Sequence, residues 1–158
     1  MKTIVLTGGG TGGHVMPNVA LLDELKKIFD KIYYLGSFNG IEKDIISKYS
    51  FVEYIPIPTV KLVRSLTPKN LLLPFKLIKS ICETKKILRK IKSDVIFSKG
   101  GFVSVPVVLA GSKLKIPIIA HESDSSIGLA NKIVLKKCNK MCFSFKELAD
   151  KYKKKGVY

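Results

Sequence analysis

The sequence has few cysteines, no tryptophan and no long apolar run, and these absences narrow the kind of protein it encodes. Its 158 residues include three cysteines, Cys82, Cys138 and Cys142, and no Cys-x-x-Cys pair. An odd number of scattered cysteines does not build a disulfide framework, so we expect reduced thiols in a cytosolic protein. The apolar stretches fall short of the ~20 residues that span a bilayer. The first of them, residues 3–7, stops at glycines, unlike the core of a secretory signal.

Acidic residues are also scarce. The chain has 28 Lys and Arg against 12 Asp and Glu, a formal net charge of +16. The first 60 residues are nearly balanced, and the excess begins at Lys61 and rises again over residues 132–155. Such a charge reflects either a Lys-rich composition or an anionic partner, which would be a nucleic acid or a membrane surface. Nucleic acid is disfavoured, because no aromatic residues alternate with the charges and no helix-turn-helix, zinc-finger or RNP motif is present.

The apolar pattern predicts one α/β domain. Hydrophobic residues make up 46% of the chain, and short apolar runs alternate with stretches of helical periodicity, which is typical of βαβ units. Strands are expected at residues 4–6, 32–35, 52–57, 95–97, 117–120 and 141–143, and helices from near Pro17 and at residues 42–48, 75–92, 105–113, 128–137 and 146–154. This predicts a Rossmann-like parallel sheet with helices on both faces over residues 1–158. The end of the chain directly after a basic helix suggests a fragment of a longer protein.

A glycine-rich loop follows the first expected strand. It reads Gly8-Gly9-Gly10-Thr11-Gly12-Gly13-His14. Glycines let backbone N–H groups approach a ligand closely, and the start of the next helix adds partial positive charge. The loop therefore predicts a seat for phosphate or for sugar oxygens. His14 would lie beside the ligand, where an imidazole can accept a proton near neutral pH, although it could also merely hydrogen-bond a neighbouring loop.

Two nucleotide-binding alternatives fit this loop poorly. The spacing Gly8-x-Gly10-x-x-Gly13 matches a dinucleotide fingerprint, but that fingerprint also needs an acid at the end of the second strand to hold the ribose. The second strand here ends Leu35-Gly36-Ser37-Phe38. A nicotinamide-dependent oxidoreductase is therefore disfavoured. A P-loop is excluded because no Gly-Lys-Ser/Thr closes the run.

Two further polar loops follow later strands. The run Ser98-Lys99-Gly100-Gly101-Phe102-Val103-Ser104 repeats the glycine-loop pattern, and His121-Glu122-Ser123-Asp124 follows the fifth expected strand. Loops at the carboxyl ends of parallel strands face one crevice, so we expect a ligand cleft there. We interpret His121 and Glu122 as structural partners beneath the loops and Asp124 as a ligand contact. Asn131, in the following helix, could cap or steady the loop.

An apolar segment lies among basic residues before the longest expected helix. Leu71, Leu72, Leu73 and Phe75 are accompanied by Lys69, Lys76 and Lys79. Apolar side chains that enter a bilayer while lysines meet anionic headgroups would explain this pattern, as would ordinary core packing. The sequence supplies no cluster of metal ligands.

Three runs resemble a known family. GGGTGGHVMPNVAL, SDVIFSKGGFVSVPVVLAG and PIIAHESDSSIGLANKI look like the N-terminal half of the MurG family, two-domain GT-B N-acetylglucosaminyltransferases of bacteria. The resemblance covers essentially the whole chain. Full-length members are roughly twice as long, and their C-terminal domain holds most of the donor nucleotide. The resemblance therefore implies an N-terminal acceptor-binding domain over residues 1–158, inactive by itself, without the domain that binds UDP-GlcNAc.

The resemblance also implies a reaction and a set of site residues. The family transfers GlcNAc from UDP-GlcNAc to the C4 hydroxyl of MurNAc in lipid I, the undecaprenyl-pyrophosphate-linked MurNAc-peptide, with inversion and without a cofactor or metal. This forms lipid II for peptidoglycan at the cytoplasmic face of the cell membrane. His14 matches the suggested general base. The implied substrate-binding residues are Gly10, Thr11, Gly12, Gly13, Gly100, Gly101, Phe102, Ser104, Asp124 and Asn131. The resemblance implies that the two glycine loops seat the acceptor pyrophosphate and that Thr11, Gly12 and Gly13 match positions on the side of the donor sugar.

Two positions depart from the family pattern, and one alternative function stays open. Asp124 stands where many relatives have Asn, which puts a hydrogen-bond donor at this position in doubt. Phe102 stands where some relatives have Tyr, so any contact through the Tyr hydroxyl is lost. The implied membrane-docking patch coincides with residues 71–75. The alternative function is a stand-alone binding subunit of a split sugar-nucleotide glycosyltransferase.

Overall fold

The computed structural model describes residues 1–59 and 72–158. In these residues, seven parallel strands form one sheet in the order β3-β2-β1-β4-β5-β6-β7. The strands are β1 (Thr3–Thr7), β2 (Lys31–Gly36), β3 (Val52–Pro56), β4 (Val95–Ser98), β5 (Ile118–Glu122), β6 (Lys140–Phe143) and β7 (Gly156–Val157). The expected Rossmann-like α/β fold is confirmed. The order reverses between β1 and β4, which opens a crevice at the carboxyl ends of these strands.

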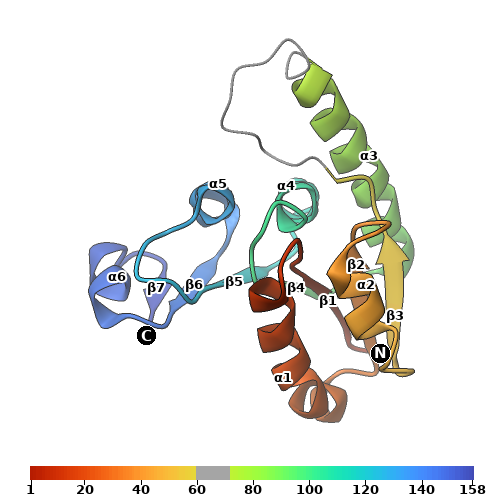
Figure 1. The fold of residues 1–158 in the computed structure, drawn as a ribbon, viewed down its shortest axis with the longest axis horizontal. Helices are drawn as coiled ribbons and strands as arrows, with labels where there is room; N and C mark the ends of the chain where they lie inside the picture. The colour runs from red at the N-terminus through yellow and green to blue at the C-terminus, as the bar shows by residue number, and fades with distance from the viewer. Residues whose placement is uncertain (60–71) are drawn as a thin grey trace.

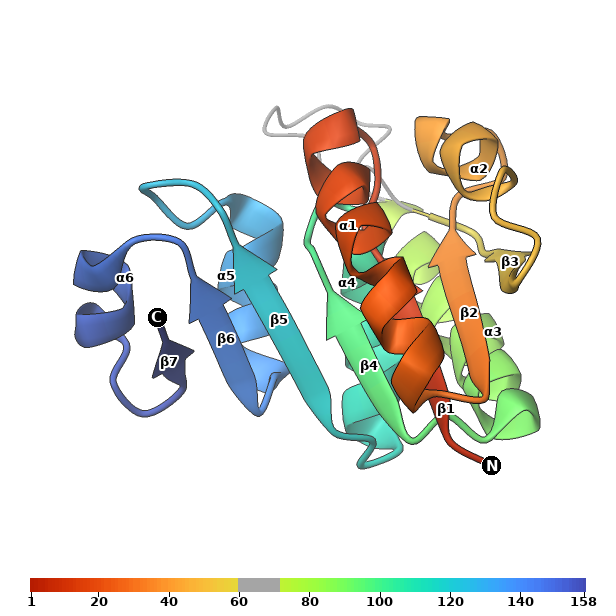
Figure 2. The ribbon, with the colours of Figure 1, turned by 90° about the horizontal axis from the view of Figure 1, so that it is seen from below.

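Helices cover both faces of the sheet. They are α1 (Gly12–Ile28), α2 (Ile41–Ile46), α3 (Leu73–Ile91), α4 (Ser104–Lys113), α5 (Leu129–Lys137) and α6 (Lys146–Lys151). The two views together show α1 and α2 on one face and α3, α4 and α5 on the other (Figures 1 and 2). The central strands are buried from both sides, and all five residues of β1 are buried, as expected for a strand between two helical layers.

Each helical layer has its own apolar core. On the side of α1 and α2, Val15, Leu22 and Ile46 pack with residues of β1 and β2. On the side of α3 to α5, the core includes Leu88, Val107 and Val134. In α1 and α3 the buried residues recur at helical spacing, so one stripe of each faces the sheet, whereas α4 is buried along most of its length.

The predicted boundaries are wrong at two places. Helix α1 begins at Gly12, earlier than the expected start near Pro17, so His14 lies in its first turn and Pro17 within the helix. Pro17 has no N–H, so the Gly13 carbonyl receives no hydrogen bond from it, and the ring crowds that carbonyl. The expected last helix also ends early, at Lys151, and a turn leads into β7, which the sequence reading missed. A side chain at Gly156 would meet the Ala149 carbonyl, 2.5 Å from an added Cβ, so this glycine permits the turn.

Candidate functional site

The first glycine loop joins the buried end of β1 to the open start of α1. A Cβ added at Gly8 would lie 2.5 Å from the His14 carbonyl, and one at Gly9 would lie 2.6 Å from the Glu42 carboxyl carbon. Gly10 has φ +88°, and a Cβ there would lie 2.6 Å from the Phe102 ring. A Cβ at Gly12, by contrast, would have no neighbour within 4 Å. The loop is therefore tightly packed at its base and open where the helix begins, as a ligand seat requires.

His14 is positioned by the first turn of α1. Its Nδ1 lies 2.9 Å from Thr11 Oγ1. In the tautomer in which Nδ1–H donates to Thr11, Nε2 carries the free lone pair. Burial lowers the pKa of His14, the positive charge of Lys99 lowers it further, and Glu122 and Asp124 oppose the shift. A neutral imidazole is the form that can accept a proton.

The second glycine loop, residues 99–101, contacts the first. Gly100 and Gly101 have φ +97° and +78°, a conformation that favours glycine. A Cβ at Gly101 would collide with the carbonyl oxygen of Gly9 and would lie 3.2 Å from His14 Nδ1. The buried Ser104 donates from Oγ to the Gly101 carbonyl at 2.8 Å. Ser104 therefore shapes this loop from beneath.

Phe102 forms a wall between the second loop and a neighbouring hollow of about 690 Å³. The hollow is lined by residues of the first glycine loop, of the loop after β2 and of the segment after β3: Gly10, Thr11, Ser37, Phe38, Asn39, Gly40, Ile41, Pro58, Thr59 and Phe102. None of these lining residues is charged. The hollow fits a neutral part of a ligand better than a phosphate.

The third loop follows β5 and is held by Glu122. Its carboxylate accepts hydrogen bonds from Asp124 N (3.1 Å), Gly128 N (3.1 Å) and Asn131 Nδ2 (3.0 Å). Asn131 also donates to the His121 carbonyl at 3.2 Å. Glu122 and Asn131 are both buried, whereas Asp124 is exposed. These contacts agree with the structural interpretation of Glu122 and with the idea that Asn131 steadies the loop.

Two charged residues of the site were missed in the sequence reading. Lys99 is 1% exposed, and its Nζ donates to Ser123 Oγ at 3.0 Å. Glu42, fully buried in α2, accepts hydrogen bonds from Gly10 N (3.3 Å), Ser37 N (3.0 Å) and Ser37 Oγ (2.6 Å). The Glu42 carboxylate therefore accepts a hydrogen bond from the Gly10 N–H, which would otherwise be free to bind an anion.

The structure brings the predicted substrate-binding residues to one edge of the sheet, where the carboxyl ends of β1, β4 and β5 meet (Figure 2). Gly13 adds to the open start of α1, because a Cβ there would contact only Thr11 Oγ1, at 3.9 Å. None of the predicted membrane-contact residues that the structure describes lines the hollow beside Phe102. Leu72, Leu73, Phe75, Lys76 and Lys79 lie at the start of α3 (Figure 1). Lys69 and Leu71 lie outside the described residues.

The start of α3 exposes apolar side chains. Leu72, Phe75 and Ile78 are 57%, 70% and 58% exposed. Lys76 and Lys79 are exposed beside them, with Lys79 3.9 Å from Glu83. Within residues 1–59 and 72–158, no helix is long and apolar enough to cross a membrane. The same residues contain no group of three or more His, Cys, Asp or Glu side chains that could hold a metal ion.

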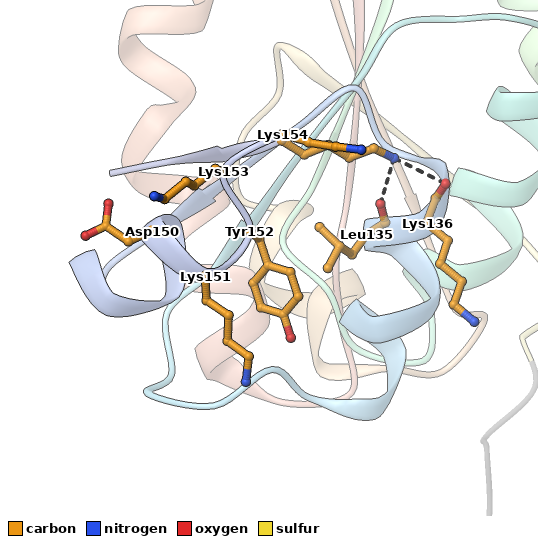
Figure 3. Close-up of a pocket in the computed structure, with 8 residues that line it drawn as sticks. Leu135, Lys136, Asp150, Lys151, Tyr152, Lys153 and Lys154 are labelled. Carbon is orange, nitrogen blue, oxygen red and sulfur yellow. Dashed lines mark hydrogen bonds between the residues drawn. The ribbon is translucent and has the colours of Figure 1, made fainter.

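A second hollow, of about 610 Å³, lies near the far end of the sheet, between the end of α5 and the segment after α6 (Figure 3). Leu135 and Tyr152 contribute apolar surface, and lysines surround them. Lys155 Nζ is engaged there by the carbonyls of Leu135 and Lys136, at 2.9 and 3.2 Å. None of the predicted substrate-binding residues lines this hollow.

Solved structures with this fold define the class of protein. The described residues superpose on Acinetobacter baumannii MurG with a TM-score of 0.78 and 26% sequence identity, covering 93% of this chain and 42% of that one. A UDP-GlcNAc 2-epimerase from Neisseria meningitidis, bound to UDP-GlcNAc, shares the fold at a TM-score of 0.65 and 13% identity, over 96% of this chain and 43% of the epimerase. The chain is thus a Rossmann-like domain of the GT-B type.

The sequence comparisons narrow the class to a family. Residues 4–143 match the Glycosyltransferase family 28 N-terminal domain, and the chain belongs to this glycosyltransferase family. Two relatives are named UDP-N-acetylglucosamine–N-acetylmuramyl-(pentapeptide) pyrophosphoryl-undecaprenol N-acetylglucosamine transferase. The protein from Clostridium botulinum (strain 657 / Type Ba4) is 53% identical over 147 residues, covering 93% of this chain and 41% of the relative. The Clostridium tetani protein is 48% identical over 157 residues, covering 99% and 44%. The chain therefore spans about two fifths of the length of these relatives.

Proposed function

We propose that residues 1–158 form the acceptor-binding domain of a glycosyltransferase that moves GlcNAc from UDP-GlcNAc to the C4 hydroxyl of MurNAc in lipid I. The names of the relatives give both substrates. The sequence identity between these relatives and this chain supports assigning the same substrates to the protein that contains this domain. We assign the binding of the donor nucleotide to the part of such a protein beyond residue 158. The observation that carries the proposal is the contact between the two glycine loops beside His14.

In the proposed mechanism, His14 is the general base. Its imidazole removes the proton of the acceptor C4 hydroxyl as that oxygen attacks the anomeric carbon of GlcNAc. The bond from this carbon to the UDP oxygen breaks in the same displacement, which inverts the configuration and releases UDP. Burial and the charge of Lys99 keep the pKa of His14 low, so the imidazole is neutral before the reaction.

The two glycine loops would seat the acceptor pyrophosphate. The open start of α1 at Gly12 and Gly13 offers backbone N–H groups and the positive end of the helix dipole. Lys99 adds positive charge on the side of β5, whereas the Glu42 carboxylate adds negative charge on the side of β2. This asymmetry favours an anion between α1 and the second loop. Asp124, at the exposed edge of the third loop, would contact a sugar hydroxyl as a hydrogen-bond acceptor.

The exposed start of α3 would dock the enzyme on an anionic membrane. Leu72 and Phe75 would enter the bilayer, and Lys76 and Lys79 would meet lipid phosphates. This orientation would serve an acceptor that is itself anchored in the cytoplasmic face of the cell membrane. The +16 net charge of the chain supports attraction to such a surface.

A transfer assay with the full-length enzyme tests the role of His14. His14→Ala should lower the rate of GlcNAc transfer to lipid I at least ~10²-fold, the low end for loss of a general base. Lys27→Ala is the matched control, because Lys27 lies exposed at the opposite end of the same helix and pairs with Glu24 at the surface. A His14→Ala rate near that of the control would remove His14 from the mechanism.

A further inference from the structure

Lys99 is a buried lysine at the point where all three loops meet. Its backbone N–H donates to the Thr7 carbonyl at 2.9 Å, which places it directly beyond β4 and beside the end of β1. Its ammonium donates to Ser123 Oγ in the loop after β5. The ion pairs found in the described part of the chain are those of Lys27, Lys79 and Lys146, so Lys99 is held by a hydroxyl and not by a direct carboxylate partner.

Packing does not explain a charge at this position. A buried ammonium loses its hydration, and an apolar side chain of similar length would fill the same space without that cost. The surroundings are polar as well. Ser98 Oγ, His121 Nδ1 and Asn131 Oδ1 are buried without a hydrogen-bond partner, and the Asn131 amide lies against Gly100. A buried polar group without a partner destabilises a fold, so three of them around one buried lysine call for a functional explanation.

Four titratable groups face Lys99 from the elements around it. His14 comes from α1, His121 and Glu122 from β5, and Asp124 from the loop after β5. Burial lowers the pKa of Lys99, and Glu122 and Asp124 counteract this. Burial followed by the charge of Lys99 lowers the pKa of His14, and the same two causes lower the pKa of His121. Glu122 raises the pKa of both histidines, and Asp124 also raises that of His14.

We propose that Lys99 is a positioning residue of this site, which ties the second glycine loop to Ser123 in the third loop and holds a buried positive charge where the three loops meet. The catalytic half of this inference rests on the proposed function, because it takes His14 as the base. The electrostatic half does not rest on the proposed function, because it concerns only how the charge of Lys99 changes the pKa values of the two imidazoles. Lys99 acts through His14 and Ser123, because its own side chain is almost completely inaccessible.

The chain itself allows a direct measurement, because it contains only two histidines. NMR titration of the two imidazoles, in the 158-residue chain labelled at histidine, gives both pKa values, and a His121→Gln variant assigns the signals. Lys99→Met should raise the pKa of His14 and of His121 relative to wild type. Lys27→Met removes the same charge from the far end of α1 and should leave both unchanged.

Two more variants separate charge from position. Lys99→Gln keeps an N–H donor on a side chain one atom shorter and carries no charge, so it should raise the histidine pKa values as Lys99→Met does. It also keeps the test available if the methionine variant fails to fold. Ser123→Ala removes the hydrogen bond and keeps the charge, so it should leave His14 below its ordinary pKa. If neither Lys99 variant raises the His14 pKa beyond the scatter of repeat titrations, the electrostatic role is wrong.

The activity of the full-length enzyme distinguishes the two halves of the inference. If His14 is the base, the acidic limb of the pH profile of kcat/KM should move to higher pH in Lys99→Gln, in parallel with the NMR titration. A raised His14 pKa with an unmoved acidic limb would support the field of Lys99 and contradict His14 as the base. An unmoved His14 pKa with an unmoved limb would overturn the electrostatic role of Lys99 and leave the proposed function intact.

Discussion

The glycines of the two loops differ in what surrounds them, and this difference predicts that the same substitution destabilises the fold at one position and not at the other. Gly101 has φ +78° and contacts the Gly9 carbonyl, whereas Gly12 has open space around its Cβ position. Gly101→Ala should lower the free energy of unfolding by about 1–3 kcal/mol, because alanine is strained at positive φ. Gly12→Ala should leave stability within about 1 kcal/mol of wild type. Urea denaturation of both variants measures this, and equal losses would contradict the geometry.

The added methyl group at Gly12 should affect binding instead of stability. It would stand at the open start of α1, where the pyrophosphate is proposed to approach the backbone. In the full-length enzyme, Gly12→Ala should therefore raise KM for lipid I more than KM for UDP-GlcNAc. Steady-state kinetics with each substrate varied in turn gives the two values, and a larger effect on the donor would assign this surface to the nucleotide.

Glu42 should make the fold sensitive to acid. Burial alone would raise its pKa, but the hydrogen bonds from Ser37 and Gly10 outweigh burial and hold the pKa below the ordinary value of 4.5. A carboxyl whose pKa is lower in the folded state stabilises that state above the unfolded pKa, and this contribution disappears as pH falls through the folded pKa.

The Glu42→Gln variant tests that dependence. It should lose about 1–3 kcal/mol of stability at neutral pH, since amide and hydroxyl donors of the loop lose a charged acceptor. The difference from wild type should shrink as pH falls from 7 to 3. Glu24→Gln, at an exposed surface pair, should change stability by less than about 1 kcal/mol. Urea denaturation across this pH range measures both, and a difference independent of pH would contradict the role of the ionised carboxylate.

At the scale of single residues, the sequence reading found the glycines and His14 but not Lys99 or Glu42. Glycine runs after strands carry a local signal, because the positive φ and close contacts of Gly10 and Gly101 require glycine. Glu42 lies in a short helix 32 positions from Gly10. Its role depends on how α2 folds back over the first loop, which no local pattern encodes. The sequence pattern places Lys99 within the second glycine loop, and only the packing shows that its side chain is buried.

At the scale of elements, the start of α3 carries the membrane prediction. Phe75→Ser and Lys76→Glu should each weaken binding of the chain to vesicles that contain anionic phospholipid, because one loses apolar burial and the other reverses a charge at the lipid surface. Lys90→Glu reverses an exposed charge at the other end of the same helix and should have a smaller effect. Vesicle sedimentation measures the binding. Equal losses in Lys76→Glu and Lys90→Glu would indicate a general effect of net charge.

The elements themselves were largely predictable, and the failures have local causes. The periodic helices α3, α4 and α5 begin and end within two residues of their expected limits. Helix α1 starts early because Gly12 and Gly13 carry no apolar periodicity, and Pro17 is tolerated inside it. Strand β7 has two residues, too few to show alternation. Its position depends on pairing with β6, which is a tertiary contact.

At the scale of the whole molecule, the sheet order explains why three separated loops form one site. β1 lies between β2 and β4, and β5 follows β4, so the loops after β1, β4 and β5 lie side by side although they are about 90 and 25 residues apart. The alternation of strands and helices predicted a parallel sheet, and the rule for ligand positions in such sheets predicted the edge. Only the structure shows that Lys99 lies on one side of this edge and Glu42 on the other.

The central claim is that this edge binds the lipid-linked acceptor and not the donor nucleotide. The most direct test is an amide NMR titration of the 158-residue chain with a soluble short-chain analogue of lipid I and, separately, with UDP-GlcNAc. The account predicts that the acceptor analogue shifts the amides of Gly12, Gly13, Gly100 and Gly101, and that UDP-GlcNAc leaves them unchanged. Shifts of these amides with UDP-GlcNAc, and none with the acceptor analogue, would contradict it.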